Sequence, residues 1–276
     1  MKKDYAPVVD MAAAAKNEAA YVEDHWSRLW QKRDVDPELA DSVVYGREEY
    51  RLLRAVLRNY PQKARILDAG CGLGQWTICL AKEGYNCTGF DISEDVVRRL
   101  KEANAPGNYL AGDIRSTKFE SNSFDVCFSW GVFEHFELGP DACFEEAFRI
   151  IAPGGALLVS VPFLNRRHMH RMRKPLWKVD GRCDLDKGYG SKMRFYQWRL
   201  TEQELRQQAL MAGFKVKSVH FLDRCEGVRR MFLELNPDFE SSRLFSPLCK
   251  LLAGLLPRSW ICHMILIEAY KPSEAQ

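Results

Sequence analysis

The sequence predicts an α/β fold with a doubly wound sheet of seven strands, mostly parallel with one antiparallel edge strand. From residue 61 onward, short apolar runs that end in acidic or glycine residues alternate with amphipathic segments of helical period. This alternation is typical of parallel strands joined by crossover helices. The chain has 276 residues, of which 46% are hydrophobic, so it can bury a large core.

Residues 1–60 are expected to form a helical cap in front of this sheet. An apolar stripe recurs there at the spacing of one helix face and consists of Val22, Trp26, Leu29 and Trp30. Asp36-Pro37 is typical of an N-cap followed by proline at the first helical position. A further helix is expected over 48–59, and Pro61 ends it.

Residues 61–162 are expected to hold five strands and three helices. The expected strands are Arg65–Leu67, Cys87–Phe90, Tyr109–Ala111, Val126–Trp130 and Ala156–Val161. The expected helices are 75–83, 94–102 and 141–151. Ser93 is expected to cap the second helix, and Pro153-Gly154-Gly155 is expected to be the turn that ends the third.

Residues 163–200 are longer than an ordinary connection and are expected to be an insertion that forms a lid or binds substrate. Its basic residues precede the first acid, Asp180, and are Arg166, Arg167, Arg171, Arg173, Lys174 and Lys178. Such a run is either a solvated face or an anion site beside an acceptor pocket. The aromatic residues that follow would line an apolar acceptor pocket or belong to the core; they are Tyr189, Phe195, Tyr196 and Trp198.

Residues 201–276 are expected to complete the sheet. Thr201 and Glu204 predict a capping box at the start of a helix that ends at Gly213, and strands are expected over 215–222 and 263–270. The apolar and basic stretch 244–260 would be a helical hairpin covering the core or would make a weak contact with a membrane surface. No domain boundary is recognisable, so we expect one domain over residues 1–276.

Composition excludes several classes of protein. Forty basic residues against 37 acidic ones give a net charge of +3, which makes nucleic acid an unlikely partner on charge grounds. Nine cysteines without a C-x-x-C pair indicate reduced, buried thiols. No signal peptide and no membrane-spanning run are recognisable, so we expect a cytoplasmic protein. No metal site is expected, since His168-Met169-His170 has no cysteine nearby.

The strongest motif is ILDAGCGLG, residues 66–74, in which a strand runs directly into a glycine-rich turn and then a helix. Gly70, Gly72 and Gly74 allow the backbone to turn sharply and to approach a ligand. By itself this pattern is weak evidence for a site. The next strand ends in Asp91, where a carboxylate can accept hydrogen bonds from both hydroxyls of a ribose. This acid strengthens the evidence that the glycine turn belongs to a binding site.

The details of the turn disfavour a dinucleotide. Gln75 stands where a dinucleotide site prefers its third glycine, and Asp68 would repel a pyrophosphate. Asp68 is better explained by a ligand with a positive amino group near the turn. An adenosine whose ribose carries an amino-acid tail fits both carboxylates, and that ligand is S-adenosylmethionine.

On these motifs the chain resembles the class I, Rossmann-like, S-adenosylmethionine-dependent methyltransferases, and in particular the type 11 branch. The resemblance covers residues 61–162 closely and the rest more loosely. The matching stretches are LDAGCGLG (67–74), GFDIS (89–93), GDI (112–114), SFDV (123–126), FEH (133–135) and APGG (152–155). The resemblance implies the class I methyltransferase fold.

The resemblance also implies roles for the glycine turn and its acids. Gly70, Gly72 and Gly74 would pack against the cofactor, Asp68 would help to hold the ammonium of its methionine part, and Asp91 would bind the ribose hydroxyls. The alternative is structural: the glycines would serve a tight turn, and Asp91 would be a helix cap.

Further roles follow from the later motifs. Ile92 would flank the adenine, Asp113 and Ile114 would recognise its amino edge, and Trp130 would lie near the methionine moiety and the sulfonium, whose charge an aromatic face favours. Arg47 is a candidate for the methionine carboxylate. In the structural alternative Asp113 is a helix cap, Ile92, Ile114 and Trp130 are core, and Arg47 is a surface residue.

His135 is the candidate catalytic residue, because it follows the fourth strand at the open end of the sheet. Methyl transfer is an in-line displacement that depends mainly on holding the two reactants in line. A base is needed only when the acceptor arrives protonated. His135 would be that base or a structural histidine that anchors the loop.

The sequence therefore predicts an S-adenosylmethionine-dependent methyltransferase that acts on a small or medium-sized acceptor, including anionic ones, at oxygen or nitrogen rather than carbon. The alternatives are an RNA or protein methyltransferase, a non-catalytic S-adenosylmethionine-binding protein and, last, an NAD-dependent oxidoreductase. The motif SWGV at 129–132 replaces the acidic-Pro-Pro-aromatic tetrapeptide of amino-purine DNA methyltransferases, which argues against that class. The sequence does not predict the oligomeric state.

Overall fold

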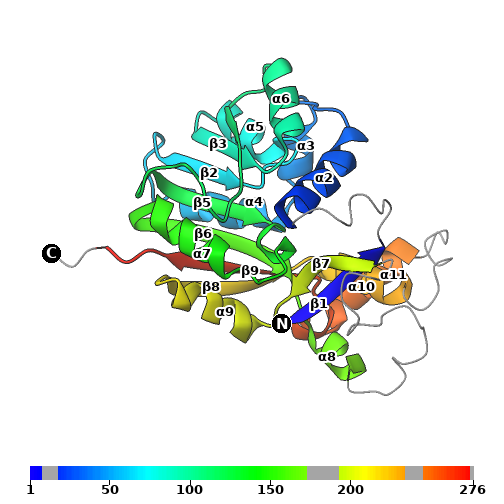
Figure 1. The fold of residues 1–276 in the computed structure, drawn as a ribbon. Coiled ribbons are helices and arrows are strands. Elements are labelled where there is room, and N and C mark those ends of the chain that lie inside the picture. Colours follow the sequence, from blue (N-terminus) through cyan, green and yellow to red (C-terminus); the bar gives the residue numbers. More distant parts are fainter. Residues whose placement is uncertain (8–17, 173–192, 234–244, 274–276) are drawn as a thin grey trace.

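A sheet of seven strands forms the centre of the molecule, with helices on both of its faces (Figure 1). The computed structural model describes residues 1–7, 18–172, 193–233 and 245–273. The strand order is β4-β3-β2-β5-β6-β9-β8, and all neighbouring pairs from β4 to β6 are parallel. The predicted doubly wound α/β fold is confirmed.

The strands of the central sheet extend one to five residues beyond several predicted ends. They are β2 (Arg65–Ala69), β3 (Asn86–Asp91), β4 (Asn108–Ala111), β5 (Phe124–Trp130), β6 (Ile151–Pro162), β8 (Lys215–Leu222) and β9 (Met264–Tyr270). The two strands of a second, small sheet are β1 (Lys2–Pro7) and β7 (Met193–Arg199).

Helices connect and cover these strands. The N-terminal ones are α2 (Glu18–Gln31), α3 (Ala40–Val44) and α4 (Glu48–Leu57). Those between strands β2 and β6 are α5 (Gln75–Lys82), α6 (Glu94–Glu102), the 3₁₀ turn η1 (Phe133–His135) and α7 (Asp141–Ile150). The later ones are α8 (Arg166–Met172), α9 (Glu202–Met211), α10 (Arg224–Leu233), α11 (Phe245–Leu255) and α12 (Arg258–Ile261).

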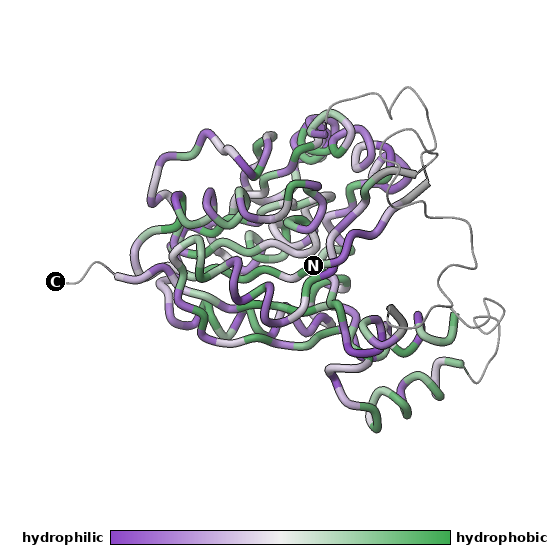
Figure 2. Tube along the Cα trace, turned by 60° about the horizontal axis from the view of Figure 1, so that its bottom comes forward, coloured by the Kyte–Doolittle hydropathy of each residue, from purple (hydrophilic) through white to green (hydrophobic). Residues whose placement is uncertain are grey.

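The period of two along each strand divides the core between the two faces of the sheet. On β5, Cys127 packs in the cluster that includes α7 and α9, whereas Val126 and Phe128 pack in the cluster that includes α4 and α5. Because both faces are covered, the inner strands are mostly apolar, and Figure 2 shows them as hydrophobic stretches running through the middle of the molecule.

The position of the antiparallel strand corrects the prediction. The strand β9 pairs antiparallel with both β6 and β8, so it lies inside the sheet and β8 forms the edge. The inner position agrees with its composition, because residues 265–269 of β9 are all buried. Their apolar run would be exposed on an edge strand.

Two turn predictions also need correction. Ile151 already pairs with Phe124, so Pro153-Gly154-Gly155 does not precede the strand β6 but forms an irregularity within it, with Gly154 at φ +79°. Asp36 does accept hydrogen bonds from the N–H groups of Glu38 and Leu39. It caps a turn, however, and the helix α3 begins only at residue 40.

The capping predictions are confirmed. The hydroxyl of Ser93 accepts a hydrogen bond from the N–H of Val96 at the start of α6. Thr201 and Glu204 form the reciprocal capping box of α9, and Gly213 follows that helix with φ +102°. These local motifs set the helix ends without help from distant parts of the chain.

The first residues of the chain form a strand and not part of a helical cap, which the sequence did not predict. The strand β1 pairs antiparallel with β7, whose residues lie within the predicted insertion. Asp4 binds Arg199 at 2.5 Å, and the Tyr5 ring meets the Phe195 ring edge-on at 6.5 Å between centroids. These contacts join the N-terminus to the insertion beside the carboxyl edge of the sheet.

The stretch predicted as a helical hairpin forms α11 and α12, which pack on α10 around Val228, Phe245, Cys249 and Ile261. Of the insertion, α8 and β7 are described, and Arg173, Lys174, Lys178 and Tyr189 lie outside the described residues. Among the described helices, none combines the length and apolar character that a membrane crossing requires.

Close packing of α10 against α12 gives a test of the fold. A Cβ added at Gly227 would overlap the carbonyl oxygen of Ile261, which is backbone and cannot move aside cheaply. We expect Gly227→Ala to lower the free energy of unfolding by about 3 kcal/mol. Gly254→Ala is the matched control, because nothing lies within 4 Å of its added Cβ. Urea denaturation should show the control unchanged or stabilised by up to about 1 kcal/mol, and equal effects would contradict this packing.

Candidate functional site

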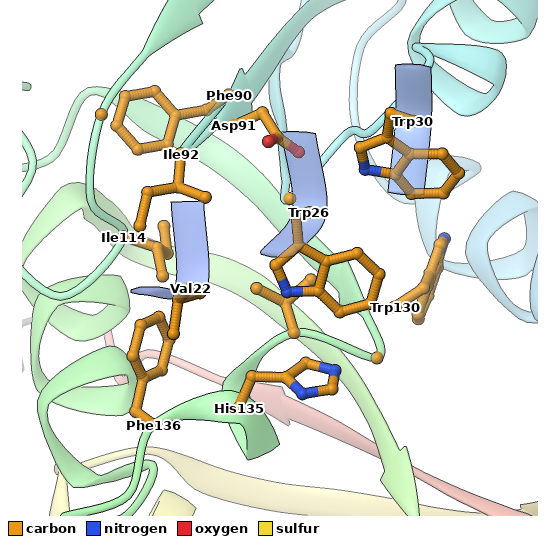
Figure 3. A pocket seen from close by; sticks show the side chains of 14 residues that line it. Val22, Trp26, Trp30, Phe90, Asp91, Ile92, Ile114, Trp130, His135 and Phe136 are labelled. Carbon is orange, nitrogen blue, oxygen red and sulfur yellow. The ribbon is translucent and has the colours of Figure 1, made fainter. Parts of the chain in front are cut away.

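A cavity of 230 Å³ lies at the carboxyl ends of β2, β3 and β5, with α2 packed over it (Figure 3). Ligand sites of open α/β sheets occur at this edge, where the strand order changes direction. The residues that line the cavity are Val22, Trp26, Trp30, Gly70, Phe90, Asp91, Ile92, Gly112, Ile114, Trp130, Gly131, Val132, His135 and Phe136. Six of the predicted site residues are therefore brought together: Gly70, Asp91, Ile92, Ile114, Trp130 and His135.

The glycine turn has one residue in the cavity wall. Gly70, Gly72 and Gly74 all have positive φ, at +90°, +50° and +74°. A side chain at Gly70 would overlap Val132, so bare backbone faces the cavity there. Gly72 and Gly74 do not line the cavity. A Cβ at Gly74 would instead meet Leu100 at 2.6 Å, which makes this glycine necessary for packing α6.

Asp91 joins the glycine turn to the end of β3. One carboxylate oxygen accepts a hydrogen bond from the N–H of Gly72 at 2.8 Å, and the other accepts one from Ser93 at 3.0 Å. Burial raises the pKa of Asp91, and these N–H groups act in the opposite direction. Asp91 lines the cavity, and each of its oxygens keeps a lone pair with which it can accept a hydrogen bond from a diol.

Asp68 lies behind the turn and not in the cavity wall. Its carboxylate accepts a hydrogen bond from the Thr77 hydroxyl at 2.8 Å, which ties β2 to α5. Burial raises the pKa of Asp68 to about 7, although the Thr77 hydrogen bond opposes the shift. Asp68 is thus outside the cavity lining, and its hydrogen bond to Thr77 stabilises the strand–turn–helix unit.

Asp113 is engaged by a neighbour, whereas Ile114 lines the cavity. The Arg115 side chain donates three hydrogen bonds to the Asp113 carboxylate, at 2.7–3.1 Å, and also pairs with Glu18 of α2. Burial alone would raise the pKa of Asp113, but the Arg115 hydrogen bonds lower it below its usual range. The acid thus anchors α2 through Arg115, and Ile92 with Ile114 forms an apolar wall (Figure 3).

Trp130 stands at the end of β5 with its ring stacked on Phe128 at 5.2 Å. Its indole nitrogen is buried, and no acceptor for its N–H is found among the described residues. A buried donor without a partner is costly, and a ligand oxygen in the cavity would satisfy it. Trp130 is therefore the lining residue that most directly indicates a bound ligand.

Arg47 does not reach the cavity. It is an exposed residue at the start of α4, and its electrostatic partners are Glu49 and Asp223. The structure thus places this predicted carboxylate ligand at the surface.

His135 lies in η1 below the Trp26 ring, with 4.8 Å between the ring centroids (Figure 3). Its Nδ1 lies 2.7 Å from the carbonyl oxygen of Tyr196, so Nδ1 carries the proton and donates it. Burial lowers the pKa of His135 to about 4. At neutral pH the ring is uncharged, and Nε2 keeps an unprotonated lone pair.

Glu134, the neighbour of His135, is buried to 2% exposure and one of its oxygens has no hydrogen-bond partner among the described residues. Burial raises the pKa of Glu134 to about 8, while a backbone hydrogen bond and the charge of Arg199 oppose the shift. Glu134 therefore holds a proton at neutral pH. Its Oε1 lies 3.8 Å from Nε2 of His135.

The N-terminal helix supplies the part of the site that sequence reasoning did not assign. Val22, Trp26 and Trp30 of α2 line the cavity, and the two tryptophan rings stack at 6.0 Å. The signal was present as an apolar helix stripe, yet a stripe alone indicates burial and does not say against what. A Cβ at Gly72 would lie 2.9 Å from Trp30, so this ring sits directly on the glycine turn.

The residues present fit S-adenosylmethionine. Asp91 can hold the ribose hydroxyls, Ile92 and Ile114 can flank the adenine, and the unpaired indole N–H of Trp130 can bind an oxygen of the methionine part. The backbone of Gly70 allows close approach of the ligand. When bound, this cofactor supplies an electrophilic methyl group on a sulfonium.

Comparisons with known proteins agree with this fit. Residues 67–159 match the family model described as methyltransferase domain. The match contains the glycine turn, Asp91, Ile114, Trp130 and His135, so it covers most of the sequence-predicted residues in the cavity. It supports S-adenosylmethionine as the cofactor of this domain.

Curated relatives are similar over the same part of the chain. A 2-methyl-6-phytyl-1,4-hydroquinone methyltransferase from Synechocystis is 33% identical over 134 residues, which are 45% of this chain and 41% of the relative. A malonyl-acyl-carrier-protein O-methyltransferase from Pectobacterium atrosepticum is 32% identical over 93 residues, 34% of this chain and 36% of the relative. The chain thus spans about two fifths of the length of these relatives.

Solved structures show the same fold over more of the chain. An S-adenosylmethionine-dependent methyltransferase from Methanosarcina mazei superposes with a TM-score of 0.55 at 20% identity, covering 82% of this chain and 99% of the other. The cyclase SpnF superposes with a TM-score of 0.53 at 17% identity, covering 81% of each chain. A fold shared by a methyltransferase and a cyclase does not by itself specify the reaction.

The buried indole N–H of Trp130 predicts a specific effect on ligand binding. Trp130→Phe should weaken the binding of S-adenosylhomocysteine about 10- to 100-fold, because a hydrogen bond to a charged oxygen is lost. Stability should change little, since this N–H has no partner among the described residues. Calorimetric titration and urea denaturation measure the two effects. Trp76→Phe, whose ring packs on Trp130 at 5.4 Å but does not line the cavity, is the control.

The protonated state of Glu134 predicts a pH dependence of stability. Its pKa is raised on folding, so the stability it contributes is complete below the unfolded value of 4.5 and is lost as the pH rises towards 8. The free energy of unfolding of the wild type, minus that of Glu134→Gln, should therefore fall between pH 5 and 8 by on the order of 1 kcal/mol per unit. A difference that stays constant over this range would show that the Glu134 carboxyl is ionised.

Proposed function

Since residues 67–159 are a class I methyltransferase domain of the type 11 branch, we propose that this chain methylates a small or medium-sized acceptor with S-adenosylmethionine. The observation that carries the proposal is the cavity in which Asp91, Trp130 and His135 converge under α2. The acid Asp91 and the unprotonated base His135 thus lie around an apolar space. The indole N–H of Trp130 also lies there and has no acceptor among the described residues. Such a site can orient two reactants and exclude water.

The helix α2 covers the cavity and would exclude water from the reacting groups. Trp26 and Trp30 lie over the cavity, and the Arg115 link between Asp113 and Glu18 holds α2 in place. Because the lining is mostly aromatic and aliphatic, charges that develop at the reacting atoms are screened little by solvent. The sulfonium charge of the bound cofactor is favoured beside the Trp130 ring.

His135 is proposed to receive the proton of the acceptor on Nε2. The hydrogen bond from Nδ1–H to the Tyr196 carbonyl fixes the ring, and Nε2 can accept a hydrogen bond from a hydroxyl. An alkylated hydroxyl is strongly acidic, so a base with a pKa of about 4 can take its proton. An ammonium holds its proton far more tightly. Among protonated acceptors, the site therefore favours oxygen over nitrogen.

The two curated relatives suggest the first acceptors to screen, which are a hydroquinone and a malonyl thioester. A quinol hydroxyl arrives protonated, whereas a carboxylate arrives ionised and needs no base. Activity with either class, measured as formation of S-adenosylhomocysteine, would support the proposal. Tight binding of S-adenosylmethionine without turnover of any class would point to a non-catalytic binding protein.

With a hydroxyl acceptor, His135→Asn should lower kcat by about 100-fold or more, because the amide keeps a donor towards Tyr196 but removes Nε2. The affinity for S-adenosylhomocysteine should change less than about threefold, since Asp91 and Trp130 are untouched. His220→Asn is the control, because that histidine lies on β8 and bonds Ser218. An unchanged kcat in His135→Asn would make His135 a structural residue.

A further inference from the structure

A second cavity, of 300 Å³, opens at the same edge of the sheet, beside the cofactor cavity. It lies where β6 and β7 end, where β9 begins and where α10 packs against them. Its lining residues are Asn165, Arg167, His168, Arg199, Gly227, Arg230, Leu233 and His263. No acidic residue is among them, and we refer to it as the basic cavity.

Neighbouring residues line the basic cavity and the cofactor cavity. Gly131 lines the cofactor cavity, and a Cβ placed there would lie 3.5 Å from the Glu134 carboxyl and 4.0 Å from Met264. Met264 directly follows His263 of the basic cavity. On the other side, the Glu134 carboxyl is close enough to Arg199 for that charge to affect its pKa. Glu134 and Met264 thus lie near residues that line both cavities.

Among the described residues, the guanidinium groups of Arg199 and Arg230 are only partly balanced by acids. Asp4 binds Nε of Arg199 at 2.5 Å, yet Nη1 of the same guanidinium is buried without an acceptor among the described residues. Glu226 binds Nε of Arg230 at 2.7 Å but is shared with Arg229. Glu134 is protonated at neutral pH, so it adds no negative charge. A buried guanidinium donor without a partner is a site for an anion.

The pKa of His263 reflects the positive charges around the basic cavity. Burial, together with the charges of Arg230 and Arg199, lowers the pKa of His263 to about 4, while Glu226 and Asp4 act in the opposite direction. The imidazole is therefore neutral at pH 7. It can donate a hydrogen bond to an anion without adding a charge of its own.

We propose that the basic cavity binds an anionic group, a carboxylate or a phosphate, of the methyl acceptor, with Arg199 and Arg230 as its ligands. The proposal deepens the proposed function and rests on it: the acceptor extends past Glu134 and Met264, with its anionic end between the two arginines and its reacting atom at His135. Acidic acceptors are thereby selected over neutral ones, because a neutral group would leave the Arg199 donor unsatisfied. Two guanidinium groups can hold either anion in a bidentate manner.

The experiment uses inorganic phosphate and malonate as probes on the full chain saturated with S-adenosylhomocysteine. NMR spectroscopy follows the imidazole of His263, assigned by His263→Asn, during each titration. An anion bound beside this ring should move its resonances saturably and raise its pKa by half a unit or more, because the anion offsets the guanidinium charges. Arg199→Met and Arg230→Gln should each weaken the binding at least tenfold.

Two controls make the outcome decisive. Arg206→Gln removes a guanidinium that pairs with Glu202 on α9 and should bind the probes as the wild type does. Arg230 is half exposed, so Arg230→Gln tests the site even where Arg199→Met, which also unties Asp4, fails to fold. Absence of a saturable shift at His263, or equal binding by Arg230→Gln and Arg206→Gln, would overturn the proposal.

The design also separates this proposal from the proposed function. Binding of S-adenosylhomocysteine, measured by calorimetry in the same samples, tests the cofactor cavity alone. If S-adenosylhomocysteine does not bind, the proposed function fails, and the same anion titration without it still tests the basic cavity. With cofactor bound, an acidic acceptor should be turned over at least tenfold more efficiently than its neutral ester, and Arg230→Gln should abolish that preference. An ester preferred by the wild type would contradict the anionic acceptor.

Discussion

The carboxylate of Asp91 holds together the elements on which the site depends. It accepts the N–H of Gly72 from the turn after β2 and the N–H of Ser93 from the start of α6. Ser93 in turn caps α6, whose Leu100 packs against Gly74. One buried acid therefore fixes the glycine turn, the end of β3 and the next helix relative to one another. Because Asp91 also lines the cavity and its oxygens retain lone pairs, the same group is available to a ligand.

The carboxyl edge of the sheet divides into two environments with different chemistry. The half beyond β2, β3 and β5 is apolar and covered by the α2 tryptophans, whereas the half beyond β6 and β9 carries arginines and a neutral His263. The loop after β5 contributes His135 to the first environment, and its Glu134 is buried beside His135 and under the influence of the Arg199 charge. Burial is the largest cause that keeps His135 unprotonated and Glu134 protonated, so neither side chain is charged at neutral pH.

Local sequence was sufficient for much of this arrangement and insufficient for the rest. Asp91, Ile92, Ile114, Trp130 and His135 were identifiable because each lies at or just after the end of a strand, and strand ends share an edge. Asp68 and Asp113 do not line the cavity, because Thr77 and Arg115 bind their carboxylates, and local sequence did not reveal these partners. The pairing of β1 with β7 and the inner place of β9 depend on contacts between distant segments, which no local pattern encodes.

The most direct test of the account is a crystal structure of the protein with S-adenosylhomocysteine. The account predicts the ligand under α2, with its ribose hydroxyls on Asp91, its adenine between Ile92 and Ile114, and an oxygen of its amino-acid part within hydrogen-bond distance of the Trp130 indole nitrogen. A ligand bound elsewhere, or one bound here whose ribose does not touch Asp91, would contradict it.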